Sequence, residues 1–191
     1  MVIKARATAE RQGVDSDEAL VARLCQGDTE ALQPLMTRHA SRVVALCGCY
    51  LDRASAEDAT QETFVRVLER CGTMKRSMAF RPWLYAIARN VCLGMLRRER
   101  VRAAVPLEDL VATADPPDQV VTEREQFQAA LREVNRLPQH YREVIIMCFL
   151  LNLTCAEAAA ALGVKPGTVR VRLHRALRRV RESLTEWGRL S

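Results

Sequence analysis

The stretch TCAEAAAALGVKPGTVRVRLHRALRRVRESL, residues 154–184, decides the fold of the C-terminal part of this 191-residue chain. Thr154 followed by Glu157 forms a capping box, which predicts a helix that begins after Thr154. Gly163 suits the left-handed position at the end of this helix, and Pro166 suits the first turn of the next one. A short helix, a tight glycine turn and a longer helix make a helix-turn-helix. The stretch therefore predicts that motif.

The second helix of the motif is predicted to have one apolar stripe and one basic face. At about 100° per residue, the apolar side chains fall within an arc of about 80°; they are Val169, Leu173, Leu177, Val180 and Leu184. The remaining surface carries His174 and the arginines Arg170, Arg172, Arg175, Arg178, Arg179 and Arg181. Arginine pairs with guanine in the major groove and also binds phosphates. A solvated basic face is the alternative for an isolated helix, but the capped helix and glycine turn before it favour binding to duplex DNA.

The rest of the chain also has a helical pattern, and no alternation of apolar and polar residues is long enough to predict a strand. Helices are expected up to Gly27 and then at about 32–51, 54–70, 80–102, 119–136, 139–151, 154–162 and 166–187. The helix at 54–70 is expected to bury Phe64, Val65 and Leu68. The predicted fold class is all-α.

An acidic stretch divides the chain into two small helical domains. Between Val105 and Glu123 there are five acids, no Lys or Arg, and the prolines Pro106, Pro116 and Pro117. In a basic protein, this composition is typical of a linker. We therefore expect a flexible N-terminal arm at 1–14, a first domain at 15–103, an acidic linker at 104–122 and a second domain at 123–191.

Composition favours a polyanionic partner and gives no sign of catalysis. The formal net charge is +6 and the isoelectric point is near 9.2, which suits nucleic acid better than an acidic substrate. The sequence holds no nucleophile–base pairing, metal-ligand cluster or glycine-rich phosphate loop. We expect no catalytic residue, no metal, no cofactor and no enzyme activity. Neither a signal peptide nor a run of about 18 apolar residues is found, so we expect a cytoplasmic protein without membrane insertion.

The seven cysteines are scattered through helical patterns, and no two have the C-x-x-C spacing of a zinc or redox site. Cys47 and Cys49 are the closest pair, and within a helix their thiols would point to different faces. We interpret the cysteines as small buried side chains in a reducing cytosol. A regulatory thiol or a metal site is the alternative.

Two stretches of the N-terminal half could meet a partner. AEDATQETFVRVLE, residues 56–69, places several acids on exposed sides of one helix, and an ordinary solvent face is the favoured interpretation. Residues 75–102 hold eight basic side chains, with Phe80, Trp83 and Tyr85 between them. Basic residues with aromatic rings suit single-stranded DNA, whose bases stack on the rings. The alternative is that the rings belong to the core, and for Trp83 this alternative is favoured.

Four stretches together resemble the extracytoplasmic-function group of bacterial sigma factors. They are DEALVARLCQGD (17–28), AEDATQETFVRVLE (56–69), FRPWLYAIARN (80–90) and GVKPGTVRVRLHRALRRVRESL (163–184). They lie in the order and spacing of that group and span about residues 15–184. The resemblance implies a first domain that binds RNA polymerase and opens the −10 element, and a second domain that binds the −35 element.

The same resemblance implies roles for particular residues. Asp58, Gln61 and Glu62 would bind the clamp helices of the polymerase β′ subunit, which reverses the solvent-face interpretation of their helix. The loop 71–79 would form the pocket for a base flipped from the non-template strand. The implied −10 contacts are Phe80, Trp83, Asn90, Arg97, Arg98 and Arg100. The implied −35 contacts are Lys165, Thr168, Arg170, Val171, Arg172, His174, Arg175 and Arg178. The group often has serine where Val171 stands, and valine can pack on a thymine methyl, so a different −35 preference is expected.

Further partners follow from the resemblance, and two other functions stay open. The polymerase β flap and an anti-sigma factor are implied partners. A regulator that binds duplex DNA as a dimer is the main alternative, although the N-terminal half shows neither a ligand pocket nor heptads. A helical adaptor that does not bind DNA would leave the basic face of the last helix unexplained.

Overall fold

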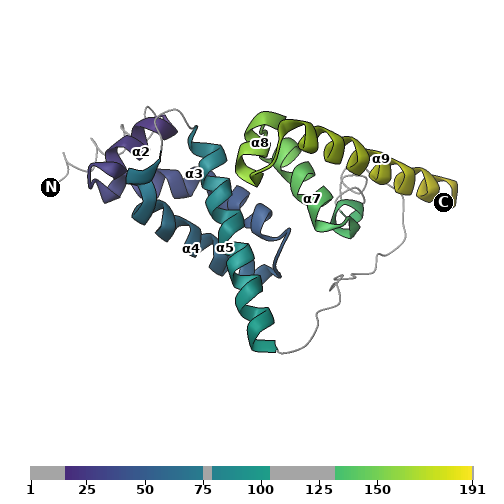
Figure 1. The fold of residues 1–191 in the computed structure, drawn as a ribbon, viewed down its shortest axis with the longest axis horizontal. Helices are drawn as coiled ribbons and strands as arrows, with labels where there is room; N and C mark the ends of the chain where they lie inside the picture. Colours follow the sequence, from purple (N-terminus) through teal and green to yellow (C-terminus); the bar gives the residue numbers. More distant parts are fainter. Residues whose placement is uncertain (1–15, 75–78, 104–131, 191) are drawn as a thin grey trace, which may run out of the picture. The chain divides into compact units, whose positions relative to one another are not determined.

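The computed structural model describes residues 16–74, 79–103 and 132–190. They fall into two compact units, which divide inside one helix, between Leu93 and Gly94. Every regular element in the described ranges is a helix or a helical turn, as Figure 1 shows. The predicted all-α fold class is confirmed. The predicted arm at 1–14, the linker at 104–122 and most of the helix at 119–136 lie outside the described residues.

The first unit is built from α-helices joined by short 3₁₀ turns. In chain order its elements are α2 (Asp17–Cys25), η1 (Thr29–Ala31), α3 (Leu32–Cys47), α4 (Arg53–Arg70), η2 (Cys71–Thr73) and the N-terminal part of α5 (Phe80–Ala103). The Ser16 hydroxyl accepts from the Ala19 N–H at 3.2 Å, and the Asp52 carboxylate accepts from the Ser55 N–H at 3.0 Å. These caps satisfy N–H groups that the starts of α2 and α4 leave unpaired.

The core of the first unit draws on all four of these helices, and α3 packs against α4. Its largest fully buried side chains are Leu20, Val21, Leu35, Val43, Leu46, Phe64, Val67, Phe80, Leu84 and Tyr85. The expected apolar side of α4 was partly wrong, because Val65 and Leu68 are exposed. The buried positions of α4 alternate by three and four around Phe64, and small side chains such as Ala59 and Thr63 occupy them.

The second unit contains the helix-turn-helix. Residues 132–136 are helical, and then follow α7 (Gln139–Ile145), one π-helical turn η3 (Ile146–Leu150), α8 (Cys155–Leu162) and α9 (Pro166–Leu190). In Figure 1, α7 lies beside α9 and α8 lies at the N-terminal end of α9, and both helices contact α9. The predicted single helix at 139–151 is therefore an α-helix that ends in a π turn.

Sequence signals at the turn of the motif are confirmed in detail. The Thr154 hydroxyl accepts from the Glu157 N–H at 3.2 Å, and the Glu157 carboxylate accepts from the Thr154 N–H at 2.8 Å. Gly163 ends α8 with φ +68°, a left-handed conformation that glycine adopts without strain. Pro166 is the first residue of α9. The helix-turn-helix geometry is thus fixed by local residues.

The apolar stripe of α9 differs from its prediction at one position. Ala176 is fully buried against Val134, Tyr141 and Ile145, whereas Leu177 is exposed. Leu173 and Val180 pack at the margin of this cluster. A small alanine at the centre lets α9 approach α7 closely, so the stripe runs through Ala176 and leaves Leu177 at its edge.

Candidate nucleic-acid interface

The N-terminal half of α9 presents a polar face to solvent. Arg170, His174 and Arg175 are exposed, and 51% of the Val171 surface is accessible. These positions are three to five residues apart or adjacent, so they share one side of the helix. Lys165 is exposed in the turn before α9, and Thr168 is half-buried in its first turn. The described part of the chain offers no ion-pair partner to Arg170 or Arg175. Their guanidinium groups are available to an external anion.

Three other arginines of α9 are held by the protein itself. Arg172 Nη1 lies 3.6 Å from a carboxylate oxygen of Glu143, a residue of α7 that is 3% exposed. Arg178 pairs with Glu182 one turn later, at 3.5 Å, and both side chains are exposed. The Arg179 guanidinium lies 4.8 Å from the centre of the Tyr141 ring, within the range of a cation–π contact. The predicted basic face is therefore divided between guanidiniums that are exposed without an ion-pair partner in the described residues and guanidiniums held by other side chains.

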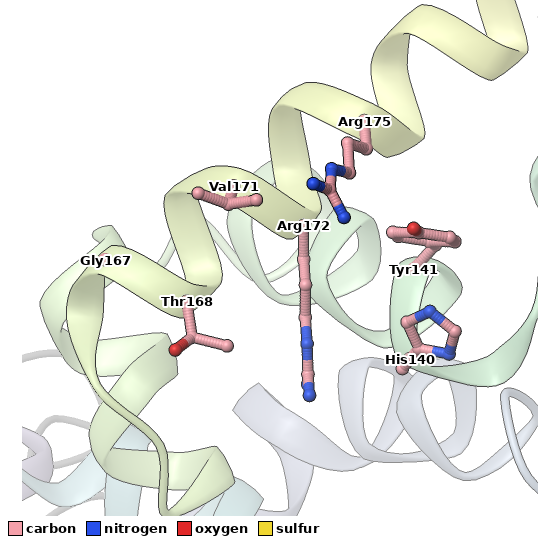
Figure 2. A pocket seen from close by; sticks show the side chains of 7 residues that line it. All are labelled: His140, Tyr141, Gly167, Thr168, Val171, Arg172 and Arg175. Atoms are coloured by element: carbon pink, nitrogen blue, oxygen red, sulfur yellow. The ribbon is translucent and has the colours of Figure 1, made fainter.

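An open depression of about 500 Å³ lies between α7 and the start of α9. It is lined by His140, Tyr141, Gly167, Thr168, Val171, Arg172 and Arg175. Figure 2 shows the Thr168, Arg172 and Arg175 side chains directed from α9 to the side where His140 and Tyr141 lie. The His140 and Tyr141 rings contact each other at a tilt of 46°, with ring centres 4.1 Å apart. Sequence patterns do not single out His140 or Glu143, because their role depends on how α7 packs against α9.

The predicted −10 residues on α5 divide into an exposed stripe and a buried support. Trp83, Asn90 and Arg97 are seven residues apart, about two turns each, so they lie on one side of the helix. Trp83 is half-buried, and Asn90, Arg97 and Arg98 are exposed. The side chain of Arg100 and residues 75–78 of the predicted base pocket lie outside the described residues. One side of α5 therefore carries an aromatic ring (Trp83), an amide (Asn90) and a guanidinium (Arg97) in succession.

Phe80 and Tyr85 do not present rings to solvent and belong to the core, as the alternative interpretation expects, whereas Trp83, for which the core was favoured, is half-buried. Phe80 and Tyr85 are both 0% exposed. The Phe80 ring lies 6.2 Å from the Trp83 ring, centre to centre, and therefore supports Trp83 from within the core. An aromatic residue beside basic residues fits either a base platform or a core, and the sequence pattern does not distinguish them.

A buried polar pair stands behind Phe80. The His39 ring meets the Phe80 ring edge-on at 5.5 Å, and His39 Nε2 lies 2.7 Å from a carboxylate oxygen of Asp17. The other oxygen of Asp17 accepts from Arg38 at 3.0 Å. Burial lowers the pKa of His39, although Asp17 opposes this effect. The imidazole is therefore neutral at pH 7 and packs against Phe80 in the core of this unit.

The exposed side of α4 combines polar and apolar groups. Asp58 and Gln61 are exposed, and Glu62 is half-buried and paired with Arg66 at 2.8 Å. Val65 is 50% exposed on the same side, seven residues after Asp58. Leu68 continues this side and is also exposed. The apolar pair was missed from the sequence, although apolar residues seven and ten positions after an exposed acid are a signal that could have found it.

A second exposed apolar pair lies in the π turn of the other unit. Phe149 is 60% exposed and Leu150 is 44% exposed. Asn152 follows with φ +51°, a left-handed conformation rare for residues other than glycine. Phe149 and Leu150 both lie within the π turn, whose i→i+5 pattern changes which positions of the helix face the core. Periodicity alone could not predict this exposure, since both residues continue an apolar run.

Six of the seven cysteines lie in neighbouring pairs, and all seven are free thiols. Cys25 interacts with Cys71, Cys47 with Cys92 and Cys148 with Cys155. Burial, with a smaller contribution from the neighbouring thiol, raises the pKa of Cys25 and of Cys148 to about 11. Cys47, Cys49, Cys71 and Cys92 are buried, as the packing interpretation expects, whereas Cys25 is exposed and Cys148 and Cys155 are half-buried, so that interpretation does not hold for these three. Within the described ranges, no three His, Cys, Asp or Glu side chains are grouped to hold a metal ion.

The fold and the exposed residues define a class: a helical protein whose C-terminal helix-turn-helix carries a basic helix. The family described as Sigma-70 region 2 matches residues 30–102, and the family described as Sigma-70, region 4 matches residues 127–180. The chain is 34% identical to the RNA polymerase sigma factor CarQ of Myxococcus xanthus, over 86% of this chain and 95% of CarQ. It is 33% identical to the ECF RNA polymerase sigma factor SigM of Mycobacterium tuberculosis, over 86% of this chain and 83% of SigM. The chain belongs to the extracytoplasmic-function (ECF) group of RNA polymerase sigma factors, which direct transcription initiation.

Another relative and two solved structures complete the comparison. The chain is 36% identical to the ECF sigma factor SigE of Mycolicibacterium smegmatis but spans 65% of the length of that protein. The structure of CnrH in complex with the cytosolic domain of CnrY has a TM-score of 0.65 at 23% identity, over 90% of this chain and 99% of that one. The sigma factor RpoE of Bartonella quintana, solved with the anti-sigma factor NepR, has a TM-score of 0.64 at 23% identity, over 80% and 96%. These structures share the fold.

Proposed function

We propose that this ECF sigma factor binds core RNA polymerase through α4 and reads promoter DNA at two points, through α5 and α9. The observation that carries this proposal is the exposed side of α9, where Arg170, Val171, His174 and Arg175 follow a capped helix and a glycine turn. Such a helix fits the major groove, where arginine and apolar side chains contact base edges. Recruitment of polymerase then places this reader in a transcription complex.

The surface for polymerase is the exposed side of α4. Asp58, Gln61 and Glu62 supply polar contacts for the β′ clamp helices, and Val65 and Leu68 add apolar area beside them. An interface with an apolar centre and charged surroundings has the composition of a stable protein–protein contact. In the second unit, the exposed Phe149 and Leu150 offer an apolar contact to the β flap.

At the −10 element, the side of α5 that carries Trp83, Asn90 and Arg97 receives the non-template strand. A flipped base stacks on Trp83, which Phe80 supports, and Asn90 donates and accepts hydrogen bonds at the base edge. Arg97, Arg98 and Arg100 bind phosphates. Extruding a base costs a few kcal/mol, which these contacts offset, so binding alone drives strand opening.

At the −35 element, α9 contributes both base contacts and phosphate contacts. Arg170 is the guanidinium available to a base edge, Val171 packs against a thymine methyl, and Arg175 contacts the DNA backbone beside them. Lys165, Thr168, Arg172, His174 and Arg178 complete the contact surface. A valine at position 171 cannot form hydrogen bonds, so the preferred −35 sequence differs from that of relatives with serine there.

The proposal also covers the location, the domains and the regulatory partner of the protein. We assign it no catalytic residue and no cofactor, so it acts as a non-enzymatic cytoplasmic factor, with domains at 15–103 and 123–191 joined by the acidic linker. No helix in the described ranges has both the length and the apolar character of a membrane span. RpoE of Bartonella quintana was solved with an anti-sigma factor, and we propose such a partner for this chain.

The direct test is reconstitution with core RNA polymerase. The purified chain is expected to bind core polymerase and to start promoter-specific transcripts in vitro, whereas a dimeric regulator would do neither. Asp58→Arg reverses a charge at the centre of the α4 surface and is expected to lower polymerase binding at least tenfold. Glu30→Arg makes the same charge change on an exposed residue of η1, outside that surface, and serves as the matched control. Equal polymerase binding by the two variants would remove α4 from the proposal.

A further inference from the structure

The depression between α7 and α9 has the chemistry of an anion seat. Arg172 and Arg175 bring two guanidiniums to it from α9, and Thr168 brings a hydroxyl. His140 brings an imidazole from α7, on the opposite wall. Either tautomer of a neutral imidazole has one N–H to donate. Among the residues that line the depression none is acidic, and the adjacent Glu143 is buried behind Arg172.

The walls of this depression are held in place by contacts of their own. The buried Glu143 carboxylate lies 3.6 Å from Arg172 Nη1, which fixes the direction of that side chain while other guanidinium N–H groups stay available. The His140 ring lies against the Tyr141 ring at 4.1 Å, and Arg179 lies over Tyr141 at 4.8 Å. Donors that are already positioned bind an anion with less loss of conformational freedom.

The position of the depression beside the reading side of α9 indicates where the anion comes from. Val171 and Arg175 belong both to the depression and to the exposed side of α9. The major groove is about 12 Å wide, and a helix with its side chains is about 10–12 Å across, so one helix fills it. His140, at the start of α7, lines the depression with Arg172 and Arg175 of α9, so it would lie beside the edge of a groove that α9 fills.

We propose that this depression seats one backbone phosphate of the −35 duplex, with His140 donating to it opposite Arg172 and Arg175. Glu143 acts as a positioning residue, because it directs Arg172 toward the phosphate instead of toward a base. His140 then sets the register of α9 in the groove without reading sequence. This inference rests on the proposed function, since it requires that α9 enters the −35 element.

The test measures binding of the chain, assembled with core polymerase, to a promoter selected by that holoenzyme. His140→Ala is expected to weaken binding at least about tenfold, the effect of one lost hydrogen bond to a charged group. The loss should be equal on promoters that differ by single −35 bases, because a phosphate is common to all sequences. Gln139→Ala, at an exposed neighbour outside the depression, should change binding by less than about twofold, and His140→Gln, which keeps an N–H, should recover part of the loss.

Neutral methylphosphonate linkages locate the contact on the DNA. Replacing one −35 phosphate after another, we expect a single position at which the wild-type holoenzyme loses affinity and the His140→Ala holoenzyme loses little more, since both changes remove the same interaction. Additive losses at every position, or a His140→Ala effect that depends on the −35 base, would overturn the inference. Melting temperatures of the variants exclude a folding defect.

Three further outcomes separate this inference from its alternatives. If inorganic phosphate alone saturates the His140 NMR signals while promoter binding stays intact, the depression is a site for a free anion, and the inference fails. If the wild-type holoenzyme forms no promoter complex at all, the proposed function fails. If it forms one that His140→Ala leaves unchanged, the phosphate seat alone is refuted.

Discussion

α5 and α9 are both long basic helices, but they expose different kinds of side chain. α9 buries a narrow stripe through Val169 and Ala176, and its N-terminal half leaves Arg170 and Arg175 in solvent. The N-terminal half of α5 buries Phe80, Leu84 and Tyr85 and leaves Trp83 half-buried. One helix therefore offers charged groups on an open surface, and the other offers a single partly covered ring.

This difference corresponds to two physical states of DNA. An intact duplex presents phosphates and base edges to solvent, so α9 can contact it without changing it. A base reaches a ring such as Trp83 only after leaving its stack, so α5 suits DNA that is opening. One protein can therefore use one helix (α9, the docking helix) to bind duplex DNA and another (α5, the capture helix) to bind a base that has left its stack.

Phe80→Ala should give the largest effect, because Phe80 is the buried support of the capture helix. Removal of a fully buried phenyl ring costs about 3–5 kcal/mol of unfolding free energy. We expect this loss in urea denaturation of the full chain, followed by a probe in the first unit.

Trp83→Ala is the matched control for Phe80→Ala. Removal of this half-buried ring should lower the free energy of unfolding much less. It should reduce the population of open promoter complexes, because about 1–3 kcal/mol of base stacking is lost. Permanganate reactivity of unpaired thymines measures that population. If Trp83→Ala were as destabilising as Phe80→Ala and left opening intact, the capture helix would have been assigned wrongly.

Arg170→Ala tests the docking helix. Loss of a base contact should cost about 1–3 kcal/mol of promoter binding and relax the preference at one −35 position. The measurement is holoenzyme affinity for promoters with each −35 base substituted. Arg179→Ala removes a guanidinium that lies over Tyr141, and it should leave base preference unchanged. A change of preference with Arg179→Ala instead would exchange the roles of the two arginines.

Thr154→Ala weakens the scaffold of α9 without touching its exposed side. Loss of the cap that Thr154 forms with Glu157 should cost about 1 kcal/mol of stability. Thermal unfolding measures the change, and Thr154→Ser, which keeps the hydroxyl, should restore most of it. Base preference at −35 should not move, so a changed preference would show that α8 contributes to reading.

Mild acid should produce the smallest effect, a loss of stability in the first unit, where His39 contacts Phe80 of α5. Burial holds the pKa of His39 below its ordinary value of 6.5, so the unfolded chain takes up this proton at higher pH than the folded chain. The stability linked to His39 is therefore complete above about pH 6.5 and declines as pH falls from there toward the lower folded pKa. Stability curves from pH 8 to 5 should be steeper for wild type than for His39→Gln, and parallel curves would exclude the linkage.

Local signals made α9 predictable before its surroundings were known. The capping box at Thr154, the glycine at 163 and the proline at 166 each act within a few residues, so their structural outcome followed from sequence. The exposure of Arg170 followed from helical periodicity, whereas the contact role of Val171 came only from the family resemblance. The exchange of Leu177 for Ala176 in the buried stripe did not, because it depends on how closely α9 approaches α7.

Features that depend on tertiary packing were less accessible to sequence reasoning. Phe80 and Trp83 are similar in type and three residues apart, and packing behind Phe80 decides which of them reaches solvent. The tether between Glu143 and Arg172 joins residues far apart in the chain. The exposure of Phe149 follows from a π turn that no periodic pattern specifies.

Mapping of transcription start sites tests directly whether one chain reads a promoter at two points. Core polymerase carrying the wild-type chain is incubated with genomic templates, in parallel with Arg170→Ala and Trp83→Ala. We expect wild-type start sites that share an upstream and a downstream element at fixed separation, with Arg170→Ala relaxing the upstream element and Trp83→Ala reducing opening at all sites. Start sites that share a single element, or no specific start at all, would contradict the claim.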